Sequence, residues 1–278
     1  MSDMGDSIGF IGLGQLGLPL AANLLQAGYP LRVYNRTSSK AEPLLEQGAQ
    51  RATQPADAAR AGGVVITLVW DDAALESVVT SAGFLERLGH GGVHLSMSTV
   101  LPATAEKLAA LHAQHGSTYV EAPIFGRPEA AVAHQLWIPV SGPDHAKERV
   151  RPLLQAMGAQ GIFDFGEAVG AAALVKLIGN FLITSAGYSM SEALQVAEKA
   201  GVDPKAVVDM LTSTLFAAPI YQSYGRRIAE GNPPFSPNGL AIPRKDVGLL
   251  RQTAEAVQSP TPIAHLLSGF LSGEAATV

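Results

Sequence analysis

The chain has 278 residues, a formal net charge of −5 at pH 7 and no cysteine. This length can bury a large core and is sufficient for two domains. A mildly acidic chain of ordinary apolar content predicts neither a nucleic-acid surface nor a basic membrane-binding patch. The absence of cysteine excludes disulfides, thiolate metal sites and cysteine nucleophiles, and we predict no metal site.

Residues 1–6 are polar and acidic, and no basic segment or apolar leader precedes the first apolar run. The most apolar segment, Ala168 to Ala200, is interrupted by Lys176, Asn180, Glu192 and Glu198. A long buried helix therefore explains it better than a membrane span. We expect a soluble, cytoplasmic protein that does not cross a membrane.

A dinucleotide-binding turn is predicted near the N-terminus. The apolar run Ile8–Ile11 leads into Gly12-Leu13-Gly14-Gln15-Leu16-Gly17, and apolar residues at helical spacing follow. Gly12 permits the tight turn, Gly14 allows the backbone to approach a pyrophosphate, and Gly17 allows the helix to pack closely on the strand. The amides and dipole at the helix N-terminus attract phosphate. A second strand, Leu31–Tyr34, about 20 residues later strengthens the interpretation.

The residues after this second strand, Asn35-Arg36-Thr37-Ser38-Ser39-Lys40, indicate which dinucleotide binds. An NAD-binding chain usually has Asp or Glu here, which accepts from the ribose 2′-hydroxyl. This run has no carboxylate and offers a guanidinium, a hydroxyl and an ammonium. Ordinary solvated charges are the alternative, but cations at a helix N-terminus oppose its dipole. We predict NADP, with NADPH preferred over NADH, bound by Asn35, Arg36, Thr37 and Lys40.

Two further apolar runs, Gly63–Val69 and Gly92–Ser96, predict buried strands of a parallel sheet. Ligands of doubly wound sheets bind outside the carboxyl ends of the strands. The residues at these ends that we expect to contact the cofactor are Val69, Trp70, Ser98 and Thr99. The two hydroxyls could instead cap a helix that begins at Pro102, and spacing alone favours that role.

The remaining runs complete the predicted architecture. Thr118–Glu121 is one more strand, and it leads into a loop punctuated by proline and glycine, Ala122–Pro128. Leu136–Gly142 and Gly161–Phe165 are short strands, with a helix from Asp144 to Met157 between them. From Val169 onward the pattern is almost entirely helical.

The sequence therefore predicts an α/β protein. An N-terminal Rossmann domain with a doubly wound sheet occupies residues 1–164, and an all-α domain with a long interdomain helix occupies residues 165–278. A helix from Val169 to Lys199 would be about 45 Å long. It is too apolar to stand alone in water, so we expect helical neighbours and a second subunit to cover it. We predict a homodimer or homotetramer that binds a small-molecule substrate.

Lys176 and Asn180 lie one turn apart on one face of this helix, in apolar surroundings. A lysine in such a setting loses part of its hydration and can exchange a proton near neutral pH. The alternative is a surface lysine whose stem covers apolar side chains, beside an asparagine that serves helix packing. Both interpretations remain open on the pattern alone.

Taken together, these segments resemble the β-hydroxyacid dehydrogenase family, which includes 3-hydroxyisobutyrate dehydrogenases and glyoxylate/succinic semialdehyde reductases. The resemblance covers nearly the whole chain. The segments that carry it are Gly12–Gly17, Ser98-Thr99 with Pro102, Glu121-Ala122-Pro123, Gly170 with Lys176 and Asn180, and Lys245-Asp246. No single segment is specific for the family, but the occurrence of all of them in this order is.

The resemblance implies hydride transfer between a nicotinamide and the carbon of a small aldehyde, keto acid or 3-hydroxy acid. Lys176 would be the general acid in reduction and the base in oxidation. Asn180 would orient the substrate, Asp246 would complete the substrate pocket, and Lys245 would lie close to the cofactor. The loop residues implied to contact the substrate are Pro123, Phe125, Gly126 and Arg127.

This loop departs from the family. The family usually reads Asp-Ala-Pro-Val-Ser-Gly-Gly, whose serine and glycine amides hold the substrate carboxylate. Here Phe125 stands at the serine position and Arg127 at the second glycine. The substrate is then larger, less polar, or anchored by Arg127. Ala172 also replaces a glycine common in the family.

Two alternatives follow from the same residues. Imine reductases share this architecture, but they usually have Asp or Tyr where Lys176 stands, whereas Phe125 favours them weakly. A dehydrogenase-like interaction protein that binds nucleotide without chemistry is the second alternative. Such relatives typically lose the catalytic lysine, so the presence of Lys176 argues against it.

Overall fold

The computed structural model describes residues 7–235 and 239–273. The chain divides into two compact units, residues 1–176 and 177–278. The long helix α9 (Ala171–Lys199) begins in the first unit and continues in the second. The boundary expected after residue 164 lies at the end of β8 (Ala159–Asp164), the last strand of the first unit.

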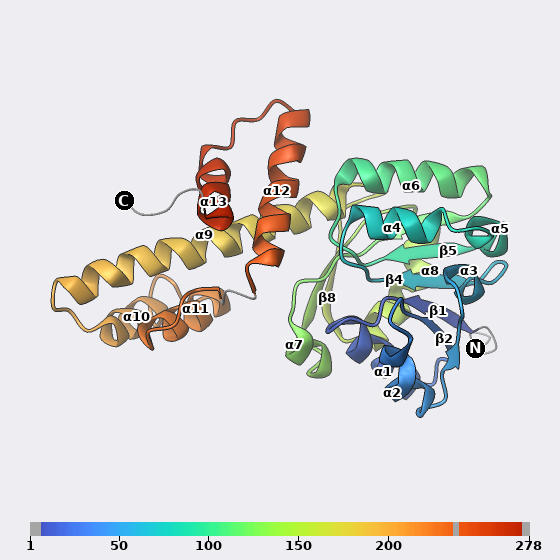
Figure 1. The fold of residues 1–278 in the computed structure, drawn as a ribbon, viewed down its shortest axis with the longest axis horizontal. Helices are drawn as coiled ribbons and strands as arrows, with labels where there is room; N and C mark the ends of the chain where they lie inside the picture. The colour runs from blue at the N-terminus through green and yellow to red at the C-terminus, as the bar shows by residue number, and fades with distance from the viewer. Residues whose placement is uncertain (1–6, 236–238, 274–278) are drawn as a thin grey trace. The chain divides into compact units, whose positions relative to one another are not determined.

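The first unit is built on a six-stranded parallel sheet with the order β3-β2-β1-β4-β5-β6 (Figure 1). Its central strands are short apolar runs, and every residue of β1 is buried, as expected for a sheet covered on both faces. The strand order reverses between β1 and β4, and ligands of doubly wound sheets bind at such a reversal, outside the carboxyl ends of the strands. The strands are β1 (Ile8–Ile11), β2 (Leu31–Tyr34), β3 (Gln50–Arg51), β4 (Val64–Thr67), β5 (Val93–Ser96) and β6 (Thr118–Glu121).

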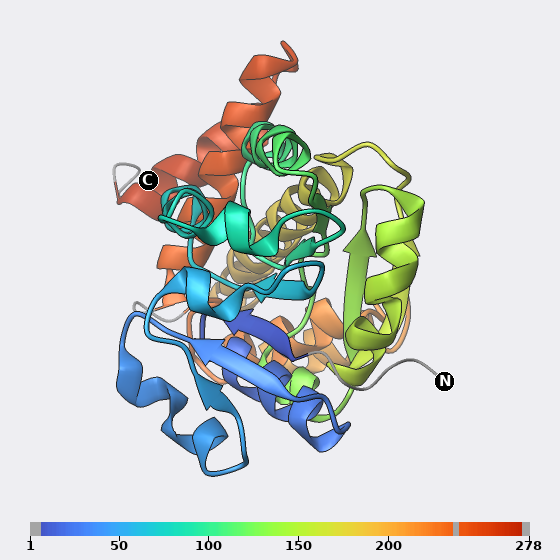
Figure 2. The same ribbon diagram turned by 90° about the vertical axis from the view of Figure 1, so that its right-hand side faces the viewer.

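Helices cover both faces of this sheet (Figures 1 and 2). One face packs against α1, α7 and α8, and the other packs against α3 to α6. Continuous apolar strands therefore bury both of their faces in two separate hydrophobic cores. The helices are α1 (Gly17–Gln26), α2 (Glu42–Leu45), α3 (Pro55–Ala58), α4 (Asp72–Val79), α5 (Phe84–Leu88), α6 (Pro102–Gln114), α7 (Pro128–Val132) and α8 (Asp144–Ala156), with the 3₁₀ turn η1 (Ser38–Ala41) before α2.

A small parallel sheet of β7 (Leu136–Val140) and β8 continues the first unit. Two antiparallel bridges, Glu121 with Ser141 and Phe125 with Trp137, attach it to the end of β6. The Lys147 ammonium of α8 lies 2.6 Å from a carboxylate oxygen of Asp164 and fixes this helix on β8. The loop after β6 is therefore held on both sides by backbone pairing.

The second unit is helical over its described residues. Its helices after α9 are α10 (Pro204–Thr212), α11 (Pro219–Ala229), α12 (Ala241–Ala256) and α13 (Pro262–Ser272). Met190 and Leu194 of α9 pack with Val208 of α10. Tyr188 of α9 stacks on Phe270 of α13, with ring centroids 5.7 Å apart. Apolar and aromatic contacts thus fix the C-terminal part of α9 within this unit.

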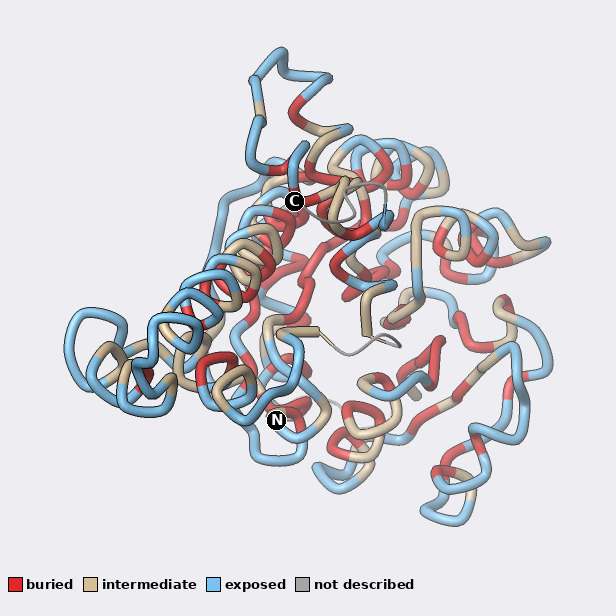
Figure 3. The backbone as a smooth tube through the Cα atoms, turned by 60° about the vertical axis from the view of Figure 1, so that its left-hand side comes forward, coloured by how far each residue is buried: buried red, intermediate tan, exposed pale blue. Residues whose placement is uncertain are grey.

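Much of the surface of α9 is exposed to solvent in the single chain. Exposed and half-exposed residues recur along it (Figure 3), and Leu174, Ile178 and Leu182 form an exposed apolar row at four-residue spacing. Within the described residues, α9 is the one helix long and apolar enough to cross a membrane by length and composition, and a third of its most apolar window is buried.

The predicted fold class is confirmed: a Rossmann sheet precedes a helical region that contains a long helix. The strand predicted as Gly63–Val69 spans Val64–Thr67, and the strand predicted as Gly92–Ser96 spans Val93–Ser96. The two-residue strand β3 was not predicted, since so short a segment has no periodicity to detect.

Candidate active site

The glycine-rich turn after β1 has the geometry that a dinucleotide requires. Gly12 has φ +101°, and a Cβ there would lie 2.1 Å from the carbonyl oxygen of Leu68. A Cβ on Gly17 would lie 2.0 Å from the carbonyl oxygen of Gly12. The fold therefore requires both glycines. A Cβ on Gly14 would meet no protein atom within 4 Å, so the space beside this backbone fits a close-lying ligand.

The N-terminus of α1 fits an anion. Its N-cap, Leu16, contributes no side-chain cap, and the first turn has no acidic residue. Gly14 and Gln15, which precede it, are exposed. The amide groups and the positive end of the helix dipole are thus directed at the space beside Gly14, as expected for a pyrophosphate site.

The four predicted cofactor residues after β2 comprise one structural residue and three exposed ones. The Asn35 side chain accepts a hydrogen bond from the Leu13 amide at 2.9 Å and donates one to the Thr37 carbonyl at 2.9 Å. Asn35 therefore ties the end of β2 to the glycine-rich turn. Arg36, Thr37 and Lys40 are exposed.

At the ends of β4 and β5, Ser98 has a role that spacing did not indicate. Its hydroxyl accepts a hydrogen bond from the Val69 amide at 2.9 Å, and its side chain is buried. Spacing favoured capping of the following helix by Ser98 and Thr99, but the N-cap position of α6 is occupied by Leu101. Ser98 instead connects the segments that follow β4 and β5. Trp70, the residue after Val69, is 53% exposed.

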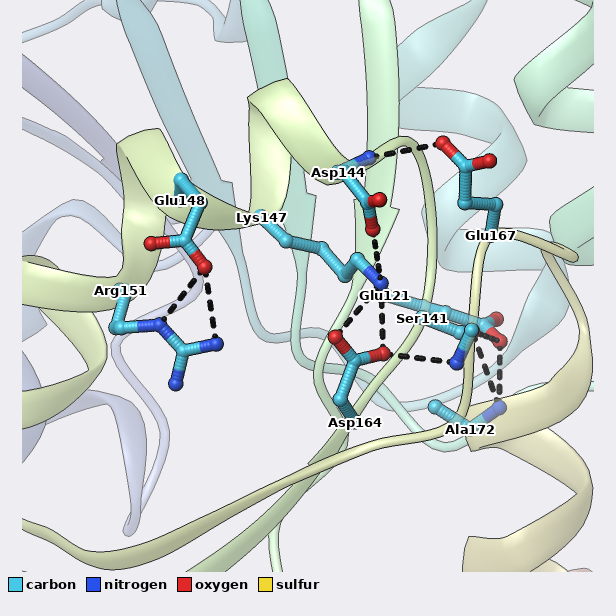
Figure 4. A network of polar contacts seen from close by, with 10 residues as sticks. Glu121, Ser141, Asp144, Lys147, Glu148, Arg151, Asp164, Glu167 and Ala172 are labelled. Carbon is cyan, nitrogen blue, oxygen red and sulfur yellow. Dashed lines mark hydrogen bonds and ion pairs between the residues drawn. The ribbon is translucent and has the colours of Figure 1, made fainter.

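Glu121, the last residue of β6, is buried at the N-terminus of α9 (Figure 4). Its Oε1 accepts hydrogen bonds from the Ser141 hydroxyl at 2.6 Å and from the amides of Gly170, Ala172 and Ala173 at 2.8, 2.9 and 3.2 Å. Burial raises the pKa of the carboxyl above its usual value, although these donors act in the opposite direction. A single carboxylate thus fixes the first turn of the long helix to the sheet.

The sequence indicated Glu121 only as part of a loop motif. Its partners lie between 20 and 52 residues away in the chain, so no local spacing could reveal this contact. The Ser141 hydroxyl also accepts from the Ala172 amide at 3.1 Å. Ala172, which replaces a common family glycine, therefore contributes its backbone to the same network.

Lys176 lies one turn after Ala172 on α9 and is 8% exposed. Its Nζ lies 4.0 Å from the centroid of the Phe125 ring. The ring face attracts the ammonium electrostatically. The structure therefore brings together Lys176, the predicted general acid, and Phe125, which stands where the substrate loop of the family usually has serine.

The other loop residues differ in exposure. Pro123 is buried, whereas Gly126 and Arg127 are exposed. Both backbone polar groups of Phe125 are paired with Trp137: its amide donates to the Trp137 carbonyl at 2.8 Å, and its carbonyl accepts from the Trp137 amide at 3.0 Å. The amide of Phe125 is therefore engaged within the protein.

In the second unit, Asn180 and the pair Lys245-Asp246 meet. The Asn180 amide nitrogen donates to Asp246 Oδ2 at 2.5 Å, and Lys245 Nζ lies 2.7 Å from Asp246 Oδ1. Asp246 is 1% exposed, so its charge is balanced by the adjacent ammonium. This carboxylate fixes the orientation of the Asn180 amide.

His94 of β5 and His112 of α6 form a buried pair. His112 Nδ1 lies 2.7 Å from the Leu108 carbonyl oxygen, and His112 Nε2 lies 3.0 Å from His94 Nδ1. Because a carbonyl only accepts, His112 donates from Nδ1 and accepts at Nε2, and His94 donates from Nδ1. His94 Nε2 then accepts from the Thr67 hydroxyl at 2.8 Å. Both rings are neutral, since burial lowers their pKa values, that of His112 to about 4.

Comparison with known proteins agrees with this fold and site. Residues 7–170 match the NAD binding domain of 6-phosphogluconate dehydrogenase, and residues 170–276 match the NAD-binding region of NADP-dependent 3-hydroxyisobutyrate dehydrogenase. The uncharacterized oxidoreductase YfjR of Bacillus subtilis is 42% identical over 270 residues, which cover 96% of this chain and 93% of that protein.

Two solved structures are similar along almost the whole chain. The 3-hydroxyisobutyrate dehydrogenase of Mycobacterium tuberculosis, solved with L-serine, is 26% identical with a TM-score of 0.83 and covers 97% of this chain and 94% of its own. Psf3, solved with NADP+ and 2-OPP, is 28% identical with a TM-score of 0.81 and covers 96% and 93%.

The fold, the glycine-rich turn and these relatives define a dehydrogenase that uses a nicotinamide cofactor. Its two halves match the two domains of one known architecture in the same order. The chain belongs to the β-hydroxyacid dehydrogenase family.

Proposed function

We propose that this protein is an NADP-dependent dehydrogenase that interconverts a carbonyl group and the corresponding CH–OH group, with Lys176 as the proton donor in reduction. The observation that carries the proposal is the burial of the Lys176 ammonium on the second turn of α9, beside the loop that follows β6. An ammonium directed at a carbonyl oxygen stabilises the developing alkoxide and then donates its proton to it. In oxidation the neutral amine takes up the same proton.

A bound NADPH would supply the hydride for this reaction. The open space at Gly14 and the uncapped N-terminus of α1 suit a pyrophosphate, and the exposed Arg36, Thr37 and Lys40 suit a 2′-phosphate. The complex of Psf3 with NADP+ supports this choice of dinucleotide. The residues proposed to contact the cofactor are Gly12, Gly14, Gln15, Leu16, Gly17, Arg36, Thr37, Lys40, Val69, Trp70, Thr99 and Lys245, with Asn35 and Ser98 holding the loops in place.

Asn180 follows Lys176 by one turn of α9, and we extend the proposal to it as a residue that orients the substrate. Asp246 fixes the Asn180 amide through the hydrogen bond from its nitrogen. The amide can then act as a rigid group rather than a rotating one. Lys245 Nζ lies 2.7 Å from Asp246 Oδ1 and pairs with this buried carboxylate.

We also propose a cytoplasmic homodimer or homotetramer. The exposed row Leu174, Ile178 and Leu182 on α9 is the support for association, because contiguous apolar surface of this kind marks an interface. Light scattering of the purified protein checks the prediction. A monomer at micromolar concentration would contradict it.

The two alternatives lead to different outcomes in one experiment. The purified protein is assayed for NADPH oxidation, with NADH in parallel, against succinic semialdehyde, uncharged aldehydes and cyclic imines. Turnover of succinic semialdehyde or of the uncharged aldehydes supports the proposed dehydrogenase. Turnover of imines alone identifies an imine reductase, and tight NADPH binding without any turnover identifies a non-catalytic nucleotide-binding protein.

A further inference from the structure

The loop after β6 carries an aromatic ring at the position that faces Lys176. Phe125 is half-buried, and its ring centroid lies 4.0 Å from Lys176 Nζ. The bridge to Trp137 uses both the amide and the carbonyl of Phe125, so its backbone cannot shift without breaking two hydrogen bonds. The ring is therefore attached to a fixed backbone beside the proposed proton donor.

The same ring face has opposite effects on cations and on carboxylates. The face of an aromatic ring is electrostatically negative, so it attracts an ammonium and repels an anion. A substrate carboxylate placed beside Lys176 would meet this negative face instead of a hydroxyl group. The Phe125 amide, a potential anion donor, is already bonded to the Trp137 carbonyl at 2.8 Å.

An apolar substituent meets no such penalty. A phenyl or alkyl group can pack against the ring and leave the Lys176 ammonium to the carbonyl oxygen. Arg127 is exposed and two residues further along the loop, so it is the remaining residue of this loop with a charge that could attract a carboxylate. The contacts of Phe125 and the charge of Arg127 thus predict opposite substrate preferences.

We propose that Phe125 determines specificity and selects uncharged carbonyl substrates with an apolar, preferably aromatic, substituent over carboxylate-bearing aldehydes. This inference rests on the proposed function, because it assumes that the carbonyl group is reduced beside Lys176. Phe125 fills part of the space beside the ammonium and excludes an anion from it. Lys176 then has one role, which is to act on the carbonyl oxygen.

The test compares succinic semialdehyde with its methyl ester, two substrates of nearly the same shape that differ by one charge, and adds phenylacetaldehyde. We expect the wild-type kcat/KM to be about tenfold or more higher for the ester and for phenylacetaldehyde than for the acid. Phe125→Ser should shift the ester-to-acid ratio by about tenfold toward the acid. Phe125→Leu should retain a preference for the ester, because its side chain is apolar.

Phe165→Ser is the matched control, since it removes an exposed aromatic ring elsewhere in the first unit and should leave the ratio unchanged. A wild-type preference for the acid that disappears in Arg127→Ala would overturn the inference. So would an ester-to-acid ratio that Phe125→Ser does not change.

A binding measurement separates this inference from the proposed function. Calorimetry on the complex with NADP+ compares succinate with benzamide, neither of which can be reduced by the enzyme. Succinate binding that is weaker than benzamide binding and that Phe125→Ser strengthens shows that Phe125 excludes a carboxylate. If no carbonyl compound is then turned over, the proposed function fails while this exclusion stands. Equal succinate affinity in the wild type and Phe125→Ser would overturn the inference whatever the activity.

Discussion

Oε1 of Glu121 accepts a hydrogen bond of 2.9 Å from the amide of Ala172, one helical turn before Lys176. The same oxygen accepts from Gly170 and Ala173, so the carboxylate satisfies backbone amides at the start of α9. Its negative charge also lies at the positive end of the helix dipole. Glu121, together with the Ser141 hydroxyl, therefore fixes the position of Lys176 relative to β6.

We predict that Glu121→Gln lowers the free energy of unfolding by about 1–2 kcal/mol, because it buries an NH₂ group at the position of Oε2, where the structure offers no hydrogen-bond partner. It should also lower kcat by about tenfold or more, since a small displacement of a catalytic group is costly. Urea unfolding and steady-state kinetics measure the two effects. Glu129→Gln, on the exposed start of α7, is the control. Unchanged kcat would show that Glu121 does not position Lys176.

Arg36→Ala tests the cofactor preference. Removing a guanidinium from a 2′-phosphate should raise the KM for NADPH by about tenfold or more and leave that for NADH nearly unchanged. Arg151→Ala, which removes a guanidinium from α8, is the control. Equal effects on the two cofactors would remove Arg36 from the phosphate site.

The buried pair His94 and His112 predicts that stability falls in mild acid. Both are neutral in the folded protein because burial lowers their pKa values, that of His112 to about 4 from an ordinary value of 6.5. Between these values the unfolded chain binds more protons than the folded one, so acid favours unfolding. Stability should be constant above about pH 7 and fall below pH 6.5, by up to about 1.4 kcal/mol per pH unit for each histidine.

Urea unfolding at pH 7.5, 6.0 and 5.0 measures this dependence. His112→Gln removes one titrating group and should flatten the decrease, whereas His134→Gln, an exposed histidine, should not. An equal slope in the wild type and in His112→Gln would assign the acid sensitivity to other groups.

The sequence pattern predicted those parts of the fold that depend on interactions between residues close together in the chain. The positive φ of Gly12 and the contact of Gly17 with the Gly12 carbonyl lie within one strand–turn–helix unit. The strand Thr118–Glu121 was predicted with its observed bounds. The edge of the sheet at which the cofactor is expected was also predictable, because the carboxyl ends of parallel strands lie along one edge.

The contacts that complete the candidate site were not predictable. Glu121 and Gly170 are 49 residues apart, and neither spacing nor composition indicates that one carboxylate would bind three helix amides. Ser98 was ambiguous because a serine just before a helix also fits a cap, and only the sheet order places it beside Val69. Asn35 was predicted to face the cofactor, while its side chain is used by the Leu13 amide.

The most direct test of the account is the turnover of Lys176→Met, which keeps an unbranched apolar side chain but has no proton to donate. We predict that kcat falls by about 10²–10⁴-fold, while the Kd for NADPH changes by no more than about twofold. Lys199→Met, at the exposed end of the same helix, should retain wild-type kcat. If Lys176→Met retains its turnover, Lys176 is not the proton donor and the proposed mechanism is wrong.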